Sequence, residues 1–533
     1  MNRNIMIKPT QNTTPYPAMD SENQKCSEKD GFRTSYFTVL TVMCLIAAVF
    51  ASCGPSTKEP LSEAIFNSVE ALSADELRIA EGFTSQVLVS SMDSIGKETR
   101  FGYDVSGLAY AGEDTGEGIL WVNHELIKPM FTSGYYGDIA RLRSQVELEQ
   151  AAVGATALKV YRDGDDWAYK VSDDAHSRIS ASAPIQLDKP VQEKESARGT
   201  VANKAVVYTS WGTFLSAEAG YEQYYGDYEF ISGNYNAGIF RWASFFRDDP
   251  RLYGWIVETD PKTGRSKKLT DLGRVRRNGM AMEQSGSQIK VYFTSRGEDG
   301  FLFRYISQEG KWPEEGTLWV ANLNLGKWVP LTLDNPVLGR LFEDKLQLQV
   351  NLEEAARAVD ATTFDSPGGL VASPAEGVLY VTTANDLNTQ NYHGSVMLIT
   401  SAGDSITWDT IVEGGEQSGV SCPAELQLDQ QGNLWIATAI PSQLMNKGVY
   451  TSFGNNALFV LPKGETNPVR IATGPVDARF GGLSFADGDQ FLFVSVQQPG
   501  ALSKSIWDFD FTSHWPAGGQ SMPRSSVIVL SRE

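Results

Sequence analysis

The chain has 533 residues, of which 41% are hydrophobic and 11% aromatic, so it can bury a large core. Its 49 glycines and 12 tryptophans fit a turn-rich β protein better than a helical bundle. The formal net charge of −20 argues against binding to nucleic acid and against electrostatic docking on anionic lipid.

A short apolar run near the N-terminus has the pattern of a bacterial lipoprotein signal. Lys29 and Arg33 precede the apolar run 36–51, and small residues lead from it to Cys53. The run has 16 residues, fewer than the roughly 20 that a membrane-spanning helix needs. We therefore predict a lipoprotein signal peptide over residues 1–53, with Cys53 as the lipid-bearing first mature residue. The alternative is a single signal-anchor helix.

The signal implies a location in the cell envelope, outside the cytoplasm, with a membrane contact only through the lipid anchor. Cys26 and Cys44 would be removed with the leader, so Cys422 would be the one unmodified cysteine of the mature chain. We therefore expect no internal disulfide and no zinc site built from cysteine and histidine.

Two further segments follow the leader. Residues 54–82 are rich in Ser, Glu and Pro, which predicts a tether with a short helix over 62–78. Residues 83–533 form the predicted propeller domain, in which period-two alternation of apolar residues recurs to the end. Helical patterns are expected only at 144–153, 238–248 and 352–359.

One short pattern recurs along this domain: a turn residue, an apolar residue, an aromatic, an apolar residue and a small polar one. It occurs at 118–123, 206–210, 289–295, 316–322, 377–383, 432–438 and 490–496. A second short strand precedes many of these, at 106–110, 278–282, 368–372, 424–428 and 481–485. Paired strands joined by tight turns form hairpins, and recurring hairpins are typical of stacked blades. We therefore predict an all-β fold, a six-bladed β-propeller with a few short helices between blades; the alternative is an array of β-sandwiches.

The inner strands of a propeller converge on a central channel, so residues at the strand tips share one pocket. The tips predicted to line this pocket are Asp104, Ser106, Asn123, His124, Glu125, Arg276, Arg277, Asn278, Arg296, Asp365, Ser366, Glu425, Arg479, Gln497 and Gln498.

Several short motifs follow one another in order from about residue 85 to the C-terminus. They include Trp-Val-Asn-His-Glu at 121–125, Gly-Thr-Val-Ala-Asn at 199–203, Ser-Trp-Gly-Thr-Phe-Leu-Ser-Ala-Glu at 210–218, Tyr-Gly-Trp-Ile-Val-Glu-Thr-Asp-Pro at 253–261, Thr-Gly-Pro at 473–475 and Val-Gln-Gln-Pro-Gly at 496–500. In these motifs and their spacing the chain resembles the PhoX-type alkaline phosphatases, secreted bacterial propellers that hydrolyse phosphate esters with calcium and iron. The resemblance independently implies a six-bladed propeller.

The chain departs from this family where the resemblance implies metal ligands. The family has Leu-x-Cys-Glu-Glu where residues 215–219 read Leu-Ser-Ala-Glu-Ala, so the thiolate expected on iron is absent. Residues 277–280, which begin with Arg277, stand where the family has His-Glu-Gly-Ala. Residues 294–296, which end with Arg296, stand where the family has Gly-Asp-Asp, and Arg479 stands where it has a Glu. An arginine at such a position puts a cation where a metal ion would sit, and like charges about 4 Å apart repel strongly.

A reduced metal site is still predicted, on the oxygen-bearing residues that remain. These are Glu125, Glu218, Glu258, Asn123 and Asp104. We expect calcium rather than iron, because calcium takes oxygen ligands alone whereas iron in such a site wants a soft or imidazole ligand as well. The alternative for each carboxylate is a strand cap or an ordinary ion pair.

The arginines at the tips have an interpretation of their own, because a guanidinium holds phosphate or carboxylate in a bidentate geometry. Arg277 and Arg479 would then stabilise the charge of a phosphorylated small molecule or another anionic ligand. The alternative is that each arginine pairs with a nearby carboxylate, such as Asp271, Glu298 or Asp477.

Two functions fit these observations. The first is a lipid-anchored, PhoX-like phosphoric-ester hydrolase, a phosphatase that is metal-assisted. The second is a catalytically inactive propeller that binds an anionic ligand or a partner protein. The missing ligands favour the second function and the ordered motifs favour the first, since a fold alone does not fix a function.

Overall fold

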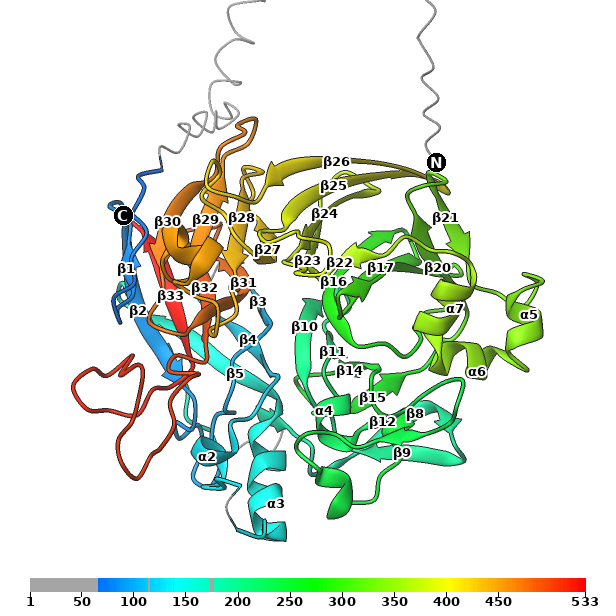
Figure 1. Cartoon of the computed structure of the whole chain (residues 1–533), viewed down its shortest axis with the longest axis horizontal. Helices are drawn as coiled ribbons and strands as arrows, with labels where there is room; N and C mark the ends of the chain where they lie inside the picture. Colours follow the sequence, from blue (N-terminus) through cyan, green and yellow to red (C-terminus); the bar gives the residue numbers. More distant parts are fainter. Residues whose placement is uncertain (1–65, 114–115, 138, 173–176) are drawn as a thin grey trace, which may run out of the picture. The chain divides into compact units, whose positions relative to one another are not determined.

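Short antiparallel strands form sheets around a central axis (Figure 1). The computed structural model describes residues 66–113, 116–137, 139–172 and 177–533, and the predicted lipid-bearing Cys53 lies outside them. The predicted all-β fold with sheets arranged as in a propeller is confirmed.

The sheets follow one another along the chain, and each has an inner strand at one edge. The first contains β3 (Leu108–Glu113), β4 (Glu117–His124), β5 (Gly154–Asp163) and β6 (Asp166–Tyr169), with β7 (Arg178–Ile179) beside β5. The second contains β10 (Asn203–Tyr208), β11 (Phe214–Glu218), β14 (Ile256–Thr259) and β15 (Ser266–Leu269), extended by β8 (Pro184–Val191) and β9 (Lys194–Arg198). The third contains β16 (Arg277–Ser285), β17 (Gln288–Ser295), β19 (Leu302–Ser307), β20 (Gly316–Asn322) and β21 (Lys327–Pro330).

The remaining sheets complete the circuit. The next set contains β23 (Pro367–Ala372), β24 (Val378–Thr383), β25 (Ser395–Ala402) and β26 (Ser405–Glu413), and β26 touches β21 at one residue pair. It is followed by β27 (Pro423–Leu428), β28 (Leu434–Thr438), β29 (Ala457–Leu461) and β30 (Val469–Thr473), with β1 (Arg78–Ile79) at the edge. The last contains β31 (Arg479–Ala486), β32 (Phe491–Gln497), β33 (Ser526–Arg532) and β2 (Phe83–Ser90). Two short pairs lie outside these sheets, β12 (Asp227–Tyr228) with β13 (Tyr235–Asn236) and β18 (Asp299–Gly300) with β22 (Phe364–Asp365).

The inner strands form a closed ring. Each of β3, β10, β16, β23, β27 and β31 contacts the next, and β31 contacts β3; Figure 1 shows their labels around the centre. Glycines permit this approach: a Cβ on Gly107 would lie 1.9 Å from the Lys204 carbonyl oxygen, and one on Gly279 would lie 2.3 Å from the Gly368 carbonyl oxygen.

The two ends of the described chain close the last sheet. Strand β2 pairs antiparallel with β33, from Phe83 opposite Arg532 to Ser90 opposite Ser526. The Gln86 side chain in β2 also donates to the Trp167 carbonyl at 2.7 Å and accepts from the Trp167 N–H at 2.8 Å. Because Trp167 belongs to β6, these bonds join the last sheet to the first.

Five predicted hairpins are confirmed, and two recurrences of the aromatic pattern have other places. The hairpins are β3–β4, β16–β17, β23–β24, β27–β28 and β31–β32. The pattern at 206–210 falls at the end of β10, an inner strand, and the pattern at 316–322 is the fourth strand of its sheet. An aromatic between apolar residues marks a buried strand but does not fix its rank in the sheet. Trp121 of β4, for example, stacks on Phe214 of the neighbouring sheet with ring centroids 4.8 Å apart.

The helices are short and lie between strands. They are α2 (Pro129–Thr132), α3 (Arg143–Ala152), α4 (Glu222–Tyr225), α5 (Leu338–Leu341), α6 (Lys345–Val350) and α7 (Leu352–Ala358), with 3-10 turns η2 (Trp242–Ser244), η3 (Pro250–Leu252) and η4 (Gly448–Phe453). The helices predicted at 144–153 and 352–359 correspond to α3 and α7. The one predicted at 238–248 is reduced to η2, because Arg241 has a left-handed backbone with φ of 52°. None of the helices in the described ranges has the length and apolar character needed to span a bilayer.

The segment before Phe83 is extended, so the helix predicted over 62–78 is wrong for its described part from Phe66 onward. The backbone N–H of Val69 donates to the Arg470 carbonyl at 2.9 Å, and the Asn455 N–H donates to the Leu72 carbonyl at 2.7 Å. Arg78 and Ile79 then pair with β30 as strand β1. Pairing with an existing sheet satisfies backbone groups that a short isolated helix would leave partly open.

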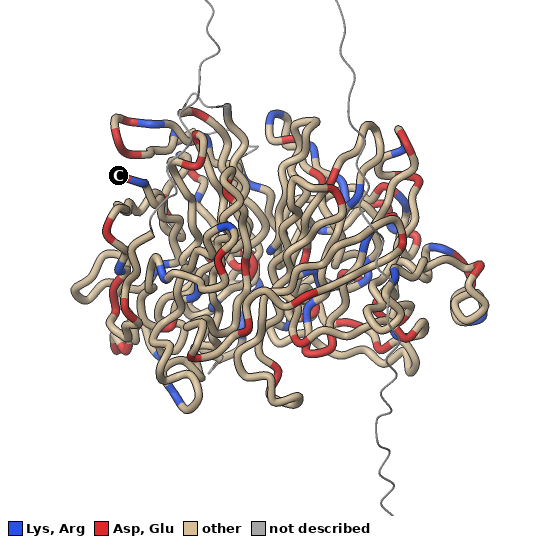
Figure 2. The backbone as a smooth tube through the Cα atoms, turned by 90° about the horizontal axis from the view of Figure 1, so that it is seen from above, with Lys and Arg blue, Asp and Glu red and all other residues tan. Residues whose placement is uncertain are grey.

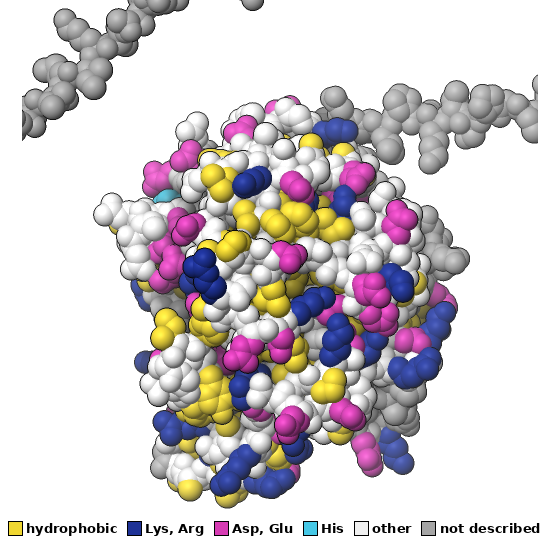
Figure 3. All heavy atoms as spheres, turned by 90° about the vertical axis from the view of Figure 1, so that its right-hand side faces the viewer, with side chains coloured by type: hydrophobic (Ala, Val, Ile, Leu, Met, Phe, Trp, Pro, Cys, Tyr) yellow, Lys and Arg dark blue, Asp and Glu magenta, His cyan; other side chains and the backbone are white. Residues whose placement is uncertain are grey.

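Charged residues of both signs alternate over the molecule instead of separating into one acidic and one basic face (Figure 2). On the face seen in Figure 3, hydrophobic side chains form several patches interrupted by charged ones. A functional site must therefore depend on a local group of charged side chains instead of one charged face.

Candidate functional site

Charged side chains from several sheets meet where the inner strands begin. We call Asp104, Glu125, Lys204, Arg296, Glu425 and Arg479 the channel-mouth cluster. Glu125 directly follows β4, Arg296 directly follows β17, and Arg479 opens β31. A cavity of about 330 Å³ runs between the inner strands, and Glu425 lines it. The cluster therefore stands at one entrance of the central channel.

Glu125 is the centre of this cluster. Its Oε1 accepts from Nη1 of Arg296 at 2.7 Å, and its Oε2 lies 3.9 Å from Nη2 of Arg479. The side chain is only 2% exposed. Burial raises the pKa of the Glu125 carboxyl, but Arg296, Lys204 and Arg479 outweigh burial and hold that pKa below its usual value. Glu125 is thus an ionised carboxylate already neutralised by basic side chains.

Arg479 is only partly satisfied. Its Nε and Nη2 atoms are buried and have no hydrogen-bond partner among the described residues. The guanidinium therefore lies at ion-pair distance from Glu125 and still has N–H groups that donate no hydrogen bond to a described residue. Buried N–H donors without a partner are costly unless a further acceptor binds them.

Asp104 and Lys204 complete the polar surroundings of Glu125. Asp104 is fully buried, and one of its oxygens accepts from the Leu126 N–H at 3.2 Å while the other has no partner among the described residues. Burial raises the pKa of Asp104 to about 7, although Arg479 opposes the rise. Nζ of Lys204 hydrogen-bonds Asn278 and lies 3.5 Å from the Glu425 carboxylate. Burial also raises the pKa of Glu425.

Glu218, predicted as a metal ligand, lies inside the second sheet with all its acceptors occupied. Nζ of Lys268 donates to it at 2.7 Å, and both side chains are fully buried. The backbone N–H groups of Val201, Gly254 and Trp255 donate to the same carboxylate at 3.2, 2.8 and 3.1 Å. Lys268 therefore supplies the positive charge that Glu218 needs in the core.

Asn123 and Glu258 also have structural partners. The Asn123 amide oxygen accepts from Trp121 and Ser216, both at 2.8 Å, and its nitrogen donates to two carbonyls of β10. Glu258 accepts from the Trp211 indole at 2.7 Å and from Thr213 at 2.8 Å, at a turn of the second sheet. The structure thus brings together Asp104, Glu125 and Arg479 among the predicted site residues, and it does not bring Glu218, Glu258 or Asn123 into the cluster.

Arg277, predicted to stabilise phosphate charge, is buried in the core. Its guanidinium donates to the carbonyls of Gly254, Leu272 and Gly273 and lies 4.4 Å from the centroid of the Phe293 ring. Burial lowers its pKa to about 9. These contacts give it a structural role, because its donors are directed at backbone carbonyls before β14 and between β15 and β16.

The carboxylate partners expected for the arginines are also different. Arg276 pairs with Glu353 at 2.9 Å, whereas Arg296 and Arg479 pair with Glu125. The carboxylates expected from sequence proximity have partners elsewhere: Asp271 pairs with Lys189 and Lys345, Glu298 accepts from Asn388, and Asp477 accepts from Leu502 and Thr512. Sequence reasoning missed Lys204 and Lys268. Lys204 directly follows the family-like motif at 199–203, whereas Lys268 gives only the signal of a lysine at an inward strand position.

These residues do not fit the calcium and iron centre that the resemblance implies. Within the described ranges, no group of three or more His, Cys, Asp or Glu side chains could hold a metal ion. Calcium takes about six to eight oxygen ligands, yet Glu125 and Glu218 are each held by basic side chains. The channel-mouth cluster holds three basic side chains beside its three carboxylates, so it can offer hydrogen-bond donors to an anion.

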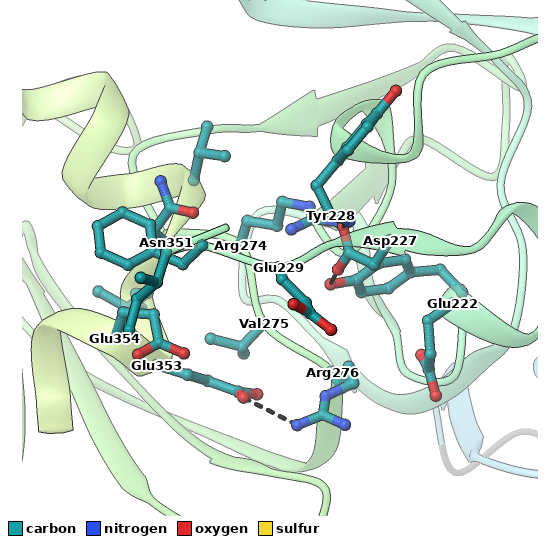
Figure 4. A pocket seen from close by; sticks show the side chains of 15 residues that line it. Glu222, Asp227, Tyr228, Glu229, Arg274, Val275, Arg276, Asn351, Glu353 and Glu354 are labelled. Carbon is teal, nitrogen blue, oxygen red and sulfur yellow. Dashed lines mark hydrogen bonds and ion pairs between the residues drawn. The ribbon is translucent and has the colours of Figure 1, made fainter. Parts of the chain in front are cut away.

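A groove adjoins the cluster. The Tyr228 groove is a cavity of about 420 Å³ lined by residues 221–222, 227–231, 274–276 and 350–354 (Figure 4). It lies between α4, the β12–β13 hairpin and α7. Arg276 joins it to the cluster, because the Arg296 N–H donates to the Arg276 carbonyl at 2.6 Å.

The ring of sheets and the charged channel mouth define a β-propeller with a central site lined by charged side chains. The family described as Alkaline phosphatase PhoX matches residues 64–500, and the chain belongs to this family. No curated protein matches the sequence.

Solved structures with a similar fold include Pseudomonas fluorescens PhoX in complex with vanadate, a transition state analogue. That protein is 22% identical, with a TM-score of 0.75 over 88% of this chain and 98% of its own. A gluconolactonase from Xanthomonas campestris is 10% identical, with a TM-score of 0.37 over 87% of this chain and 98% of its own.

Proposed function

We propose that this chain recognises the phosphoryl group of a phosphate ester at the channel-mouth cluster, through arginine side chains. The observation that carries the proposal is Arg479, whose buried Nε and Nη2 groups have no hydrogen-bond partner among the described residues. Arg296 and Lys204 add positive charge beside it. A phosphoryl group offers several acceptor oxygens in the geometry that guanidinium groups bind best.

Membership of the PhoX family supports this ligand class, and so does the vanadate held by the similar Pseudomonas protein. Arg277 has no role in phosphoryl recognition, because its donors are already bound to backbone carbonyls. Glu125 has a positioning role in it: the carboxylate lies 2.7 Å from Arg296 and 3.9 Å from Arg479, and so keeps the two guanidinium groups close to each other.

Calorimetric titration of the full chain with inorganic phosphate and with vanadate tests the proposal. Arg479→Gln is expected to weaken binding by about tenfold or more, since a charged hydrogen-bonded contact is worth about 1.5–3 kcal/mol. Arg162→Gln is the matched control, because Arg162 is about as exposed as Arg479, 28% against 29%, and pairs with Asp487 away from the cluster. Absence of binding to the unsubstituted chain would refute the proposal.

Hydrolysis of the bound ester is the second candidate function, and family membership is the observation that favours it. The assay compares p-nitrophenyl phosphate and its bis-ester, with added calcium and with chelator. Turnover that survives chelation and disappears in Arg479→Gln would assign the chemistry to this chain's own side chains. Turnover that requires calcium would show that the remaining carboxylates recruit an ion, and no turnover would leave recognition as the function.

We also propose that the chain is lipid-anchored through Cys53, outside the cytoplasm. The basic residues, short apolar run and small residues before Cys53 support this. Metabolic labelling with a fatty acid should mark the wild-type chain and not Cys53→Ser. Equal labelling of the two chains would contradict the anchor.

A further inference from the structure

The Tyr228 groove is distinct from the channel mouth in shape and in charge. Carboxylates outnumber arginines among the residues that line it. The carboxylates are those of Glu222, Asp227, Glu229, Glu353 and Glu354, against Arg274 and Arg276. Figure 4 shows these side chains grouped around the cavity. The two arginines neutralise only part of this charge, because Arg274 is bound to Asp227 at 2.8 Å and Arg276 to Glu353 at 2.9 Å.

Two carboxylate oxygens in the groove are left over. Oε2 of Glu222 and Oε1 of Glu353 are buried and have no hydrogen-bond partner among the described residues. Burial raises the pKa of Glu222, although Arg276 and Arg296 lower it. A buried carboxylate oxygen without a hydrogen-bond donor is unfavourable unless a positive charge lies beside it, so both atoms favour a cationic ligand.

Aromatic rings form the other walls of the groove. Tyr221 lies 4.5 Å from the Arg274 guanidinium, measured to the ring centroid, and its hydroxyl donates to Asp227 at 3.0 Å. Tyr228 is 42% exposed, and Arg251 lies 5.0 Å from its ring centroid. Tyr221 is buried against the Arg274 guanidinium, whereas Tyr228 stays exposed, and an exposed ring near carboxylates suits an organic ammonium group.

We propose that the Tyr228 groove binds the ammonium group of an amine-bearing phosphate ester whose phosphoryl group lies at the channel-mouth cluster. The proposal rests on the proposed function for its phosphoryl half only. The two halves are close in the fold, because Arg276 lines the groove and its carbonyl accepts from the N–H of Arg296 at 2.6 Å. Ligands of this chemistry are soluble amino-alcohol phosphates and zwitterionic lipid headgroups.

The groove is tested first without phosphate, using choline and the full chain. Saturation-transfer NMR on the choline methyl signal should show binding that Glu222→Gln weakens by about tenfold, the loss of one charged contact. Glu354→Gln is the matched control: Glu354 lines the same groove but is bound to Arg357 at 2.6 Å, so little change is expected. Tyr228→Leu gives a second variant at an exposed position and should also weaken choline binding.

The second test compares phosphorylcholine with glycerol 1-phosphate, which lacks the ammonium. Phosphorylcholine should bind about tenfold more tightly, and Glu222→Gln should remove that preference while leaving inorganic phosphate binding unchanged. Displacement of choline by dissolved phosphorylcholine assigns a soluble ester, and displacement only by vesicles of phosphatidylcholine, not of phosphatidylglycerol, assigns a lipid headgroup.

The outcomes separate the groove from the channel mouth. If choline does not bind the unsubstituted chain, the groove proposal is wrong even where phosphate binds. It is also wrong if choline binds Glu222→Gln and Tyr228→Leu as tightly as it binds the unsubstituted chain. Equal affinity for phosphorylcholine and glycerol 1-phosphate would also overturn it. If choline binds as expected and inorganic phosphate does not, the groove proposal holds and the proposed function fails.

Discussion

Lys268 and Glu218 form an ion pair in which both side chains are fully buried. Burial lowers the pKa of Lys268, and Glu218 opposes that change. In the family pattern this glutamate follows a cysteine and belongs to the metal centre, whereas here a lysine of the same sheet neutralises it. The consequence is that this part of the core carries its own cation.

We expect Lys268→Met to lower the free energy of unfolding by about 3 kcal/mol, because it leaves Glu218 buried without its counter-charge. Urea unfolding followed by tryptophan fluorescence measures the change. Lys267→Met, in the same strand but half-buried, is the control and should change stability little. The double variant Lys268→Met/Glu218→Gln should recover part of the loss; no recovery would mean that the lysine acts through packing instead of charge.

Asp104 predicts a pH dependence of stability. Its pKa is raised from 3.8 to about 7 by burial, so between these values the folded state binds more protons than the unfolded state. Stability must therefore fall as pH rises through this range, and the loss is complete above about pH 7.

The comparison that isolates this effect is Asp104→Asn, which cannot ionise. The free energy of unfolding of Asp104→Asn, relative to wild type, should increase by about 3 kcal/mol between pH 5 and pH 8. Asp334→Asn, at an exposed position, is the control. Parallel stability curves for wild type and Asp104→Asn would show that Asp104 ionises normally.

At this scale the sequence could identify which residue types gather, but not their partners. The expectation that strand tips share one pocket placed Asp104, Glu125 and Arg479 together, because Asp104 and Glu125 lie near strand ends of the first sheet and Arg479 opens β31 of the last. It could not tell that Glu218 faces Lys268, since the two are 50 residues apart and their pairing depends on β11, β14 and β15 lying side by side. Partners on strands distant in the sequence are set by tertiary packing, which a single sequence does not show.

The inner strands show why one pattern was readable at the level of elements. Their glycines precede an apolar residue in Ser-Gly-Leu, Asn-Gly-Met and Gly-Gly-Leu, and a Cβ at Gly107 or Gly482 would clash with the neighbouring inner strand. The repeated glycine is therefore required by the close approach of neighbouring inner strands in the ring. The outer strands have no such constraint, so their number and pairing, as in β8 and β9, could not be predicted.

Lys128 connects two elements. Its Nζ donates to the carbonyls of Ala501 and Ser503 at 2.7 and 2.9 Å, which ties the start of α2 to the long segment between β32 and β33. The same atom lies 5.0 Å from the centroid of the Phe131 ring in α2. Burial lowers the pKa of Lys128 to about 8.

Lys128→Met should release this segment, because the charged hydrogen bonds to its backbone are lost. The segment exposes Trp507 and Phe509, at 73% and 67%, so chymotrypsin should cleave it about tenfold faster in the variant. Lys504→Met, an exposed lysine in the same segment, serves as the control. Equal cleavage rates in Lys128→Met and wild type would show that the segment is held by its aromatic contacts instead.

For the whole molecule, closure of the ring decides which residues share a site. Strand β2 enters the sheet of β31 to β33, so a strand near the beginning of the described chain completes the last sheet. This arrangement could be expected from a propeller but not from local sequence, because β2 reads like any other short strand. Its pairing partner lies more than 400 residues away, and only the closed ring brings the two together.

Gln86 offers the sharpest test of that closure. Its side chain makes two hydrogen bonds with the backbone of Trp167 and so joins β2 to β6 of the first sheet. Gln86→Ala leaves both backbone groups of Trp167 without these partners, and we expect a loss of about 1–3 kcal/mol in the free energy of unfolding. Because the bonds lie between the last sheet and the first, hydrogen exchange should accelerate along β2, β33 and β6 before it does so elsewhere. Gln308→Ala, at an exposed position, is the control. Exchange that accelerates evenly through all sheets would mean that the ring opens as a unit and that Gln86 does not specifically stabilise the contact between the last sheet and the first.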